Sequence, residues 1–383
     1  MGCGVVGAAI AYELSCRPEF HVTVLDQAPP AQGATAAALG VAMAIISHKV
    51  KGRNWRLREQ SLRRYQSLIP ELEALTGHRI QRNSQGILSL CFDLVDLPRW
   101  RSLQEIRQRQ GYRLEIWQSG EMCDRTPHLN PNGVVAAIYS PHDFQLHPTA
   151  LTQALVAGAS AQGAEFHCGE PVVGFEQTGG FEQTGGVEQT GGFEQTGGEE
   201  TEAICAVHTA GHTFAADAVV LSAGLGTLPL TTTLHQPIPV GPVLGQALRL
   251  HLDHPLGHPD FQPVVNGHDI HLVPLGEGDY WVGATVEFPP EISPAEALAL
   301  QPEPEGLEAL LAKATAYCPA LAKGTVTERW TGLRPRPQGQ AAPVIQPLAG
   351  HSNVWLATGH YRNGVLLAPA TALAICEALG SGS

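Results

Sequence analysis

Three glycines at the start of this 383-residue chain constrain its fold more than any other feature. Gly2, Gly4 and Gly7 match the pattern GxGxxG. In a βαβ unit the first of these glycines makes a tight turn, the second lets the backbone approach a pyrophosphate, and the third lets the helix pack on its strand. We therefore predict that this loop, including Val5 and Val6, contacts a dinucleotide. The alternative is a glycine-rich turn in another kind of α/β protein.

The residues after the loop complete the predicted unit. Residues 8–14 are small and apolar, which predicts a helix whose N-terminal amides face a diphosphate. Polar and apolar residues alternate over 21–25, and several of them are β-branched, as in a buried strand. This strand leads into Asp26 and Gln27, about twenty residues past the loop, where an acid accepts ribose hydroxyls. Because an acid here disfavours a 2′-phosphate, NADP is not the expected cofactor.

No strand precedes the glycine loop in this sequence. In a dinucleotide-binding fold that strand is central, so its absence exposes the hydrogen-bonding edges of its two neighbours. A start placed several residues too late, or a truncated chain, would explain the absence. We expect the chain as written to bind its cofactor poorly or to be unstable. We expect about six β-branched residues before Gly2 to rescue it.

Composition narrows the class of protein. The hydrophobic fraction of 43% supports a sizeable core, and the net charge of −13 disfavours nucleic acid or an anionic membrane as a partner. No apolar stretch approaches the ~20 residues of a membrane span, and no secretory signal opens the chain. The eight cysteines are scattered, which indicates reduced thiols and a cytoplasmic protein. The histidines at 251, 254 and 258 lie among prolines and glycine, so no metal site is expected.

A loop of small residues follows the first unit, over 32–41. The absence of bulky side chains suits a backbone that lies close to a flat ring system, although an ordinary helix start is the alternative. The expected cofactor contacts in this loop are Thr35, Ala36, Ala37, Ala38, Gly40 and Val41. Leucines at helical spacing over 55–75 then predict an amphipathic helix that belongs to the scaffold.

Six-residue repeats interrupt the middle of the chain. Residues 175–198 are four copies of a unit that reads Phe or Val followed by Glu-Gln-Thr-Gly-Gly. A β-solenoid is one interpretation of such a period, but paired glycines without an aliphatic core favour an expanded, solvent-exposed loop between strands. Because a longer surface loop adds little closure entropy, we expect the fold to tolerate it.

Beyond the repeat the pattern changes from helical to strand-rich. Residues 216–224 predict a buried strand that ends in Ala223 and Gly224, which suits a second close approach of the backbone to the cofactor. Residues 240–285 are rich in predicted strands, and their pattern is typical of an antiparallel sheet. A helix is expected around 304–317.

The C-terminal third holds the most specific motifs. Residues 328–335 read ERWTGLRP, residues 342–345 read APVI, and residues 354–370 read VWLATGHYRNGVLLAPA. With the glycine loop, the 37–40 loop and the 219–224 strand, they resemble the glycine oxidase/D-amino acid oxidase-like family of FAD-dependent amine oxidoreductases. The likeness is greatest to the glycine oxidases of thiamine biosynthesis, and it covers nearly the whole chain apart from the repeat.

The resemblance implies FAD as the cofactor and an α/β fold, α+β overall, with two domains. Residues 1–80, 141–232 and 328–383 would form a Rossmann-like FAD-binding domain, and residues 81–140 and 233–327 an antiparallel-sheet substrate domain. The helix that begins at Gly364 would direct its N-terminus at the flavin. Further implied cofactor contacts are Val173, Gly245, Gly359, His360, Tyr361, Arg362, Asn363, Gly364, Val365 and Leu366.

Arg334 is the first candidate for binding a substrate. It stands between Leu333 and Pro335, an unfavourable place for a guanidinium without an anionic partner. A substrate carboxylate suits its two parallel donors, and the resemblance places a carboxylate-binding arginine here. A structural salt bridge is the alternative. Arg362, in the flavin-facing loop, is expected to line the same pocket.

Two positions depart from the family pattern. His271 occupies the place of a tyrosine that helps to hold the carboxylate, and Leu275 the place of an arginine. A histidine would act with different geometry and pH dependence, or would simply pack in the sheet.

The resemblance implies oxidative deamination of a small amino acid or amine such as glycine. Hydride passes to flavin N5, and the imine hydrolyses to a keto acid and ammonia, with oxygen as the expected acceptor. Alternatives are a dehydrogenase of the same fold that uses a quinone or carrier, a non-catalytic flavin fold, and an NAD dehydrogenase. A homo-oligomer is possible.

Overall fold

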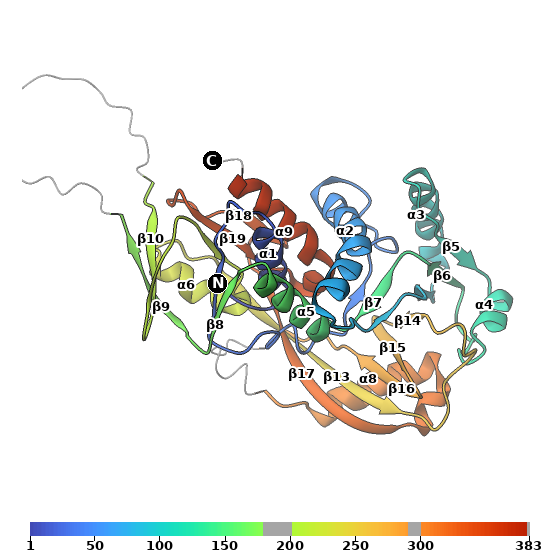
Figure 1. Cartoon of the computed structure of the whole chain (residues 1–383). Coiled ribbons are helices and arrows are strands. Elements are labelled where there is room, and N and C mark those ends of the chain that lie inside the picture. The colour runs from blue at the N-terminus through green and yellow to red at the C-terminus, as the bar shows by residue number, and fades with distance from the viewer. Residues whose placement is uncertain (179–200, 290–299, 381–383) are drawn as a thin grey trace, which may run out of the picture.

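The computed structural model describes residues 1–178, 201–289 and 300–380. One part gathers helices around short parallel strands, and the other is built on a large, mostly antiparallel sheet (Figure 1). This arrangement confirms the expected α/β fold class. The hexapeptide repeat from residue 179 onward lies outside the described residues, whereas its beginning belongs to strand β9 (Val172–Gln177).

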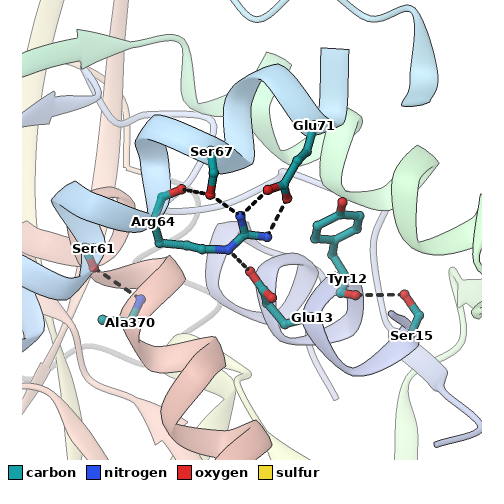
Figure 2. Close-up of polar contacts among 8 residues, drawn as sticks. All are labelled: Tyr12, Glu13, Ser15, Ser61, Arg64, Ser67, Glu71 and Ala370. Carbon is teal, nitrogen blue, oxygen red and sulfur yellow. Dashed lines mark hydrogen bonds and ion pairs between the residues drawn. The ribbon is translucent and has the colours of Figure 1, made fainter. Parts of the chain in front are cut away.

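The helices of the first part pack around α1 (Val5–Ser15). The small side chains of α1 allow close contact with α5 (Pro148–Ala161) and α9 (Gly364–Gly380), while α2 (Gly52–Thr76) covers α9 and α5. Figure 2 shows the polar link between α1 and α2, where Arg64 lies between Glu13 at 2.7 Å and Glu71 at 2.8 Å. On the same helix, Ser61 Oγ accepts a hydrogen bond from the backbone N–H of Ala370 at 3.2 Å. These contacts join the glycine-loop helix, the amphipathic helix and the C-terminal helix into one layer.

Two short parallel pairs of strands lie beside these helices. β1 (Thr23–Asp26) pairs with β8 (Glu165–Cys168), and β12 (Val219–Leu221) pairs with β19 (Val354–Thr358), which in turn pairs with β18 (Val344–Pro347). Met1 and Gly2 lie between the two pairs. The N-terminal ammonium donates to Val220 O at 2.7 Å, and Gly2 N donates to Leu25 O at 2.8 Å. The first two residues therefore bridge β12 and β1.

The second part is a sheet of eight strands among the described residues, in the order β17-β13-β16-β15-β14-β4-β6-β5. Only the β14–β4 pair is parallel. Helix α8 (Pro304–Tyr317) packs on the sheet, and α3 (Leu97–Arg109) and α4 (Ser119–Arg125) lie near its β5 end. The strands are β17 (Thr325–Pro337), β13 (Val240–His251), β16 (Asp279–Gly283), β15 (Ile270–Gly276), β14 (Val264–Gly267), β4 (Ile87–Cys91), β6 (Ala136–Ser140) and β5 (Glu115–Trp117).

The long strand β17 (Thr325–Pro337) crosses the domain boundary expected at residue 328. It pairs with β13 from Val240↔Pro337 to His251↔Thr325, so residues 328–337 belong to the large sheet rather than to the parallel strands. A local sequence pattern does not show this, because the pairing partner lies far away in the chain.

Two small sheets complete the structure. β2 (Val41–Ala42), β7 (Phe144–Leu146) and β3 (Arg82–Asn83) form one, in that order. β11 (Thr213–Ala215), β10 (Ile204–Thr209) and β9 form the other, and helix α6 (Thr227–Thr233) follows β12.

Two buried charges hold the backbone that follows β2. The Asp143 carboxylate accepts hydrogen bonds from the amides of Ala44, Ile45 and Ile46 at 2.7–2.8 Å. From the other side, Arg107 donates to the carbonyls of Ile45 and Ser47, both at 2.7 Å. The segment is thus fixed through both its donors and its acceptors.

The C-terminal helix corrects one expectation from the sequence. Tyr361–Gly380 spans 20 residues with a mean hydropathy of 1.4, which is long and apolar enough to cross a membrane. The statement that no stretch approaches this length is therefore wrong. In this structure 56% of the apolar 18-residue window within the stretch is buried, and α9 packs against α1 and α2 as a core helix.

Candidate active site

The glycine loop forms a cradle in which side chains do not fit. A Cβ on Gly7 would lie 1.9 Å from Gly2 O, and a Cβ on Gly2 would lie 2.6 Å from Ser222 O. Gly2 also has a φ of +99°, which favours glycine. A Cβ on Gly4 would lie 3.1 Å from Thr35 Oγ1. The three glycines therefore bring the loop close to β12 and to the small-residue segment.

Amide donors at this loop are ordered by two side chains. Helix α1 begins at Val5 with Gly4 as its N-cap, and no side chain of the cap closes this end. Thr35 Oγ1 accepts from Val5 N at 3.0 Å, and Asp26 Oδ2 accepts from Cys3 N at 2.5 Å. Helix N-termini of this kind bind phosphate groups. The structure thus places Asp26 and Thr35 at the glycine loop, where both accept hydrogen bonds from its backbone.

The small-residue segment is pressed against the large sheet. A Cβ on Gly332 in β17 would lie 2.2 Å from the Cβ of Ala37, and Trp330 Nε1 donates to Ala37 O at 3.1 Å. Gly40 has a φ of +71°, and a Cβ there would lie 1.7 Å from Leu146 O. Glycine is thus required at position 40 because the backbone of β7 lies so close to it. The sequence had suggested another reason, the approach of a flat ring.

The motif at residues 359–366 forms the entry to α9. Gly359 has a φ of +66°, and Tyr361, at +54°, also adopts the left-handed region. His360 is buried, its Nε2 lies 2.9 Å from Thr371 Oγ1, and burial lowers its pKa to about 3. His360 therefore stays neutral and serves the packing of this turn.

Helix α2 supports the same turn through two side chains that no sequence motif marked as functional. Arg58 donates to Asn363 Oδ1 at 3.0 Å, and the Tyr65 hydroxyl donates to Val365 O. Both residues stand in the helix that was assigned to the scaffold. No local pattern distinguished them from its other polar and aromatic side chains.

Arg334 lies on β17 opposite Val243 of β13. Its guanidinium donates to Leu244 O and to Thr285 O, both at 3.0 Å. A Cβ on Gly245 would lie 2.3 Å from its Nη2, so the guanidinium occupies space that only glycine leaves open. Burial lowers the pKa of Arg334, and no acidic side chain pairs with it among the described residues. A cation placed in this way favours an anionic ligand.

Arg362 is already paired. Its Nη1 and Nη2 donate to the two oxygens of Asp269 at 3.0 and 2.8 Å. Asp269 stands in the turn between β14 and β15, where His268 and Asp269 have φ values of +51° and +64°. Burial alone would raise the pKa of Asp269, but Arg362 reverses the effect and lowers it. Asp269 was missed because nothing in its local sequence marked it as the partner of a residue near the C-terminus.

His271 follows on β15, between Asn266 of β14 and Gly283 of β16. Its Nδ1 is buried and has no hydrogen-bond partner in the described structure. Burial, reinforced by the charge of Arg362, lowers its pKa to about 4. The imidazole is therefore neutral near pH 7. Arg334, Arg362, Asp269 and His271 form one charged cluster, which we call the arginine cluster.

Other expected cofactor residues have varied surroundings. Val173 on β9 is 61% exposed, and Gln27 is exposed at the end of β1. Ala223 and Gly224 follow β12, where Gly224 has a φ of +57° and its Cβ position lies 3.9 Å from Pro335. Ala223 and Gly224 therefore lie at the end of β12, close to Pro335 of β17 and beside the glycine loop.

The fold and the site together define a class of protein. A glycine cradle at a helix N-terminus fits the diphosphate of a dinucleotide. On the neighbouring sheet, the partly buried guanidinium of Arg334 has no acidic partner within the described part of the chain, which fits a small acid as ligand. This is the architecture of a dinucleotide-dependent enzyme.

The family model of the FAD dependent oxidoreductases matches residues 1–378. The chain belongs to this family, which confirms the resemblance drawn from the sequence and gives FAD as the cofactor.

Individual relatives agree with the family assignment. The bifunctional protein ThiO/ThiG of Synechocystis sp. is 30% identical over 384 residues, covering 98% of this chain and 50% of the relative. A glycine oxidase of Pseudomonas putida is 30% identical over 376 residues, covering 97% of this chain and 91% of the relative. The chain thus spans about half the length of the bifunctional relatives it matches.

A solved structure shows the same fold. The glycine oxidase of Bacillus cereus ATCC 14579 superimposes with a TM-score of 0.80 at 21% identity, covering 100% of this chain and 94% of the other.

Proposed function

We propose that this protein oxidises a small amino acid of the glycine type. The observation that carries the proposal is the partly buried guanidinium of Arg334, which has backbone carbonyls but no acid as partners in the described residues. A carboxylate that accepts two parallel N–H donors completes such a site. The family and the glycine oxidases among the relatives support the same substrate class.

The residues of the glycine loop fit FAD. Gly2, Gly4 and Gly7 keep the backbone free of Cβ atoms, the amides at the start of α1 suit the diphosphate, and Asp26 suits the ribose. The 359–366 turn and the 35–41 segment are the proposed flavin contacts, together with the other cofactor residues named from the sequence. When bound, FAD supplies the two-electron oxidation of the substrate.

The protein's own residues bind and orient the substrate. Arg334 holds the carboxylate, which fixes the α-carbon in one position and removes much of the entropic part of the barrier. His271, neutral near pH 7, is available for one further hydrogen bond. Arg362 and Asp269 form an ion pair, so together they add no net charge to the arginine cluster. Loss of two electrons and two protons from the amino acid leaves an imine, and water hydrolyses the imine to a keto acid and ammonia.

Oxygen is the proposed electron acceptor, the cytoplasm the proposed location, and thiamine biosynthesis the proposed pathway. The proposed substrate domain is residues 81–140 and 233–327 together with residues 328–337 of β17, and the parallel-strand part is the proposed FAD-binding domain. A second candidate, a dehydrogenase that passes electrons to a quinone or carrier, is separated by measuring hydrogen peroxide.

The proposal is tested by anaerobic reduction of the FAD-loaded protein. Glycine, sarcosine and D-alanine are expected to bleach the flavin absorbance. Arg334→Ala is expected to raise the KM for glycine on the order of 100-fold, because a charge-assisted pair contributes about 2–3 kcal/mol. Arg329→Ala removes an exposed cation from the same strand and is the matched control. If none of these amines bleaches the flavin, the proposal is wrong.

A further inference from the structure

A second arginine stands beside Arg334 on the same face of β17. Side chains of a strand alternate between its two faces, so Trp330, Gly332, Arg334 and Arg336 share one face. Trp330 and Gly332 contact Ala37 of the proposed flavin-binding segment. Arg336 therefore lies farther along the strand from that segment than Arg334 does, about 6.6 Å beyond it.

Two aromatic rings flank Arg336. Its guanidinium carbon is 5.3 Å from the centre of the Phe288 ring and 5.8 Å from the centre of the Tyr361 ring. Tyr361 directly precedes Arg362, so the ring links Arg336 to the arginine cluster. Contacts of this kind orient a guanidinium over an aromatic face while its N–H groups stay available as donors.

The acids nearest to these arginines have other partners. Asp269 is engaged by both Nη atoms of Arg362. Glu287 Oε1 accepts from Gln246 Nε2 at 3.0 Å and from the Thr285 hydroxyl. Within the three described stretches, neither Arg334 nor Arg336 forms an ion pair. Arg336 is exposed, and a substrate with one carboxylate, held by Arg334, leaves it without an acidic partner among the described residues.

We propose that Arg336 is a second anion-binding residue of the site, and that amino acids with an additional acid group are preferred over their neutral analogues. The first carboxylate binds Arg334, and the second acid group extends away from Ala37 toward Arg336. This inference rests on the proposed function, because it takes the carboxylate role of Arg334 as given. It names a substrate class of the aspartate or N-carboxymethyl type.

Binding of simple acids tests the proposal without turnover. Titration calorimetry on the FAD-loaded protein compares acetate with malonate, which differ by one carboxylate. Malonate is expected to bind roughly 10-fold more tightly than acetate, as suits one added charge pair at a partly solvated site. Arg336→Ala is expected to abolish this difference and leave acetate unchanged. Arg336→Lys should keep part of it, and the control Arg329→Ala should keep all of it.

Turnover provides the second measurement. D-aspartate is compared with D-alanine, and N-(carboxymethyl)glycine with sarcosine, a pair that has no stereocentre. The ratio of kcat/KM for the acidic to the neutral member is expected to fall about 10-fold in Arg336→Ala. The inference is overturned if the native protein does not favour malonate, or if Arg336→Ala leaves its preference unchanged.

The two proposals fail in different ways. If acetate binds Arg334→Ala as well as it binds the native protein, the carboxylate role of Arg334 is wrong. If acetate depends on Arg334 but the malonate advantage does not depend on Arg336, only the second anion-binding residue is wrong.

Discussion

One imidazole in the arginine cluster shares its surroundings with two guanidinium groups. His271 has a pKa lowered to about 4 by burial and by Arg362 and Arg334, so it does not add a third positive charge near pH 7. An unpaired buried nitrogen is costly in itself, and a ligand that hydrogen-bonds to the imidazole recovers that cost. The neutrality of His271 therefore suits a residue that contacts substrate.

The lowered pKa of His271 predicts a pH dependence of stability. In the unfolded chain an ordinary histidine takes up a proton below about pH 6.5, whereas the folded protein does so only near pH 4. The unfolded state thus binds more protons between these values, so the free energy of unfolding falls as the pH drops from 6.5 to 4. The loss is at most about 3 kcal/mol.

Urea unfolding of the native protein and of His271→Gln at pH 7, 6, 5 and 4 measures this effect. The free energy of unfolding of the variant should fall less between pH 7 and pH 4, by the amount attributed to His271. His254→Gln removes an exposed histidine and should leave the slope unchanged. Equal slopes for the native protein and His271→Gln would show that His271 titrates normally.

A single methyl group at Gly7 is expected to disrupt the glycine cradle. The added Cβ would lie 1.9 Å from Gly2 O, and neither backbone segment can yield without moving β12 or α1. Gly7→Ala should lower the free energy of unfolding by about 3 kcal/mol and reduce FAD retention. Gly120→Ala in α4 meets no atom within 4 Å and is the control. Retention of flavin by Gly7→Ala, measured by absorbance after gel filtration, would contradict the proposed cradle.

At the scale of elements, the parallel strands depend on the first two residues. Met1 and Gly2 bridge β12 and β1, and the N-terminal ammonium is buried, which lowers its pKa to about 6. The charged form is thus disfavoured in the fold. Between pH 8 and 6 the unfolded chain binds the proton more readily, so stability falls as the pH drops through this range.

An N-terminal extension tests this interpretation. About six β-branched residues placed before Met1 would extend the pairing along the open edges of β1 and β12. We expect the midpoint of thermal unfolding to rise and its dependence on pH between 6 and 8 to weaken, because the buried ammonium becomes an amide. A matched extension of six Gly and Ser residues is the control. Equal midpoints for the two extensions would argue against strand pairing at this site.

At the scale of the whole molecule, the repeat joins two strands that already meet. Thr178 N donates to Ala203 O at 2.8 Å, and Gln177 lies opposite Ile204 across the β9–β10 pair. Glu202 is bonded through its backbone to Gly350 and Ser352. The ends of this connection are therefore held together by the described structure itself.

Replacing residues 179–200 by Asn-Gly should preserve the fold. The shorter connection closes at a lower entropic cost, so the free energy of unfolding is expected to rise by about 2 kcal/mol. Extending the deletion through Ala203 removes the backbone contacts of Glu202 and Ala203, and this control should be less stable. Chemical denaturation and flavin content measure both variants. Loss of flavin in the first variant would show that the repeat supports the fold.

Signals within short stretches of sequence were enough to predict the dinucleotide loop, the acid at position 26, the small-residue segment and the need of Arg334 for an anion. Each depends on neighbours in the chain, where spacing and hydrophobicity act directly. The tertiary structure alone decided the pairing of Arg362 with Asp269, 93 residues apart, and the carbonyl ligands of Arg334 up to 90 residues away. It also decided the neutrality of His271 and the stacking of Arg336. These features depend on the register of β13, β15 and β17, which is selected by the packing of the whole sheet.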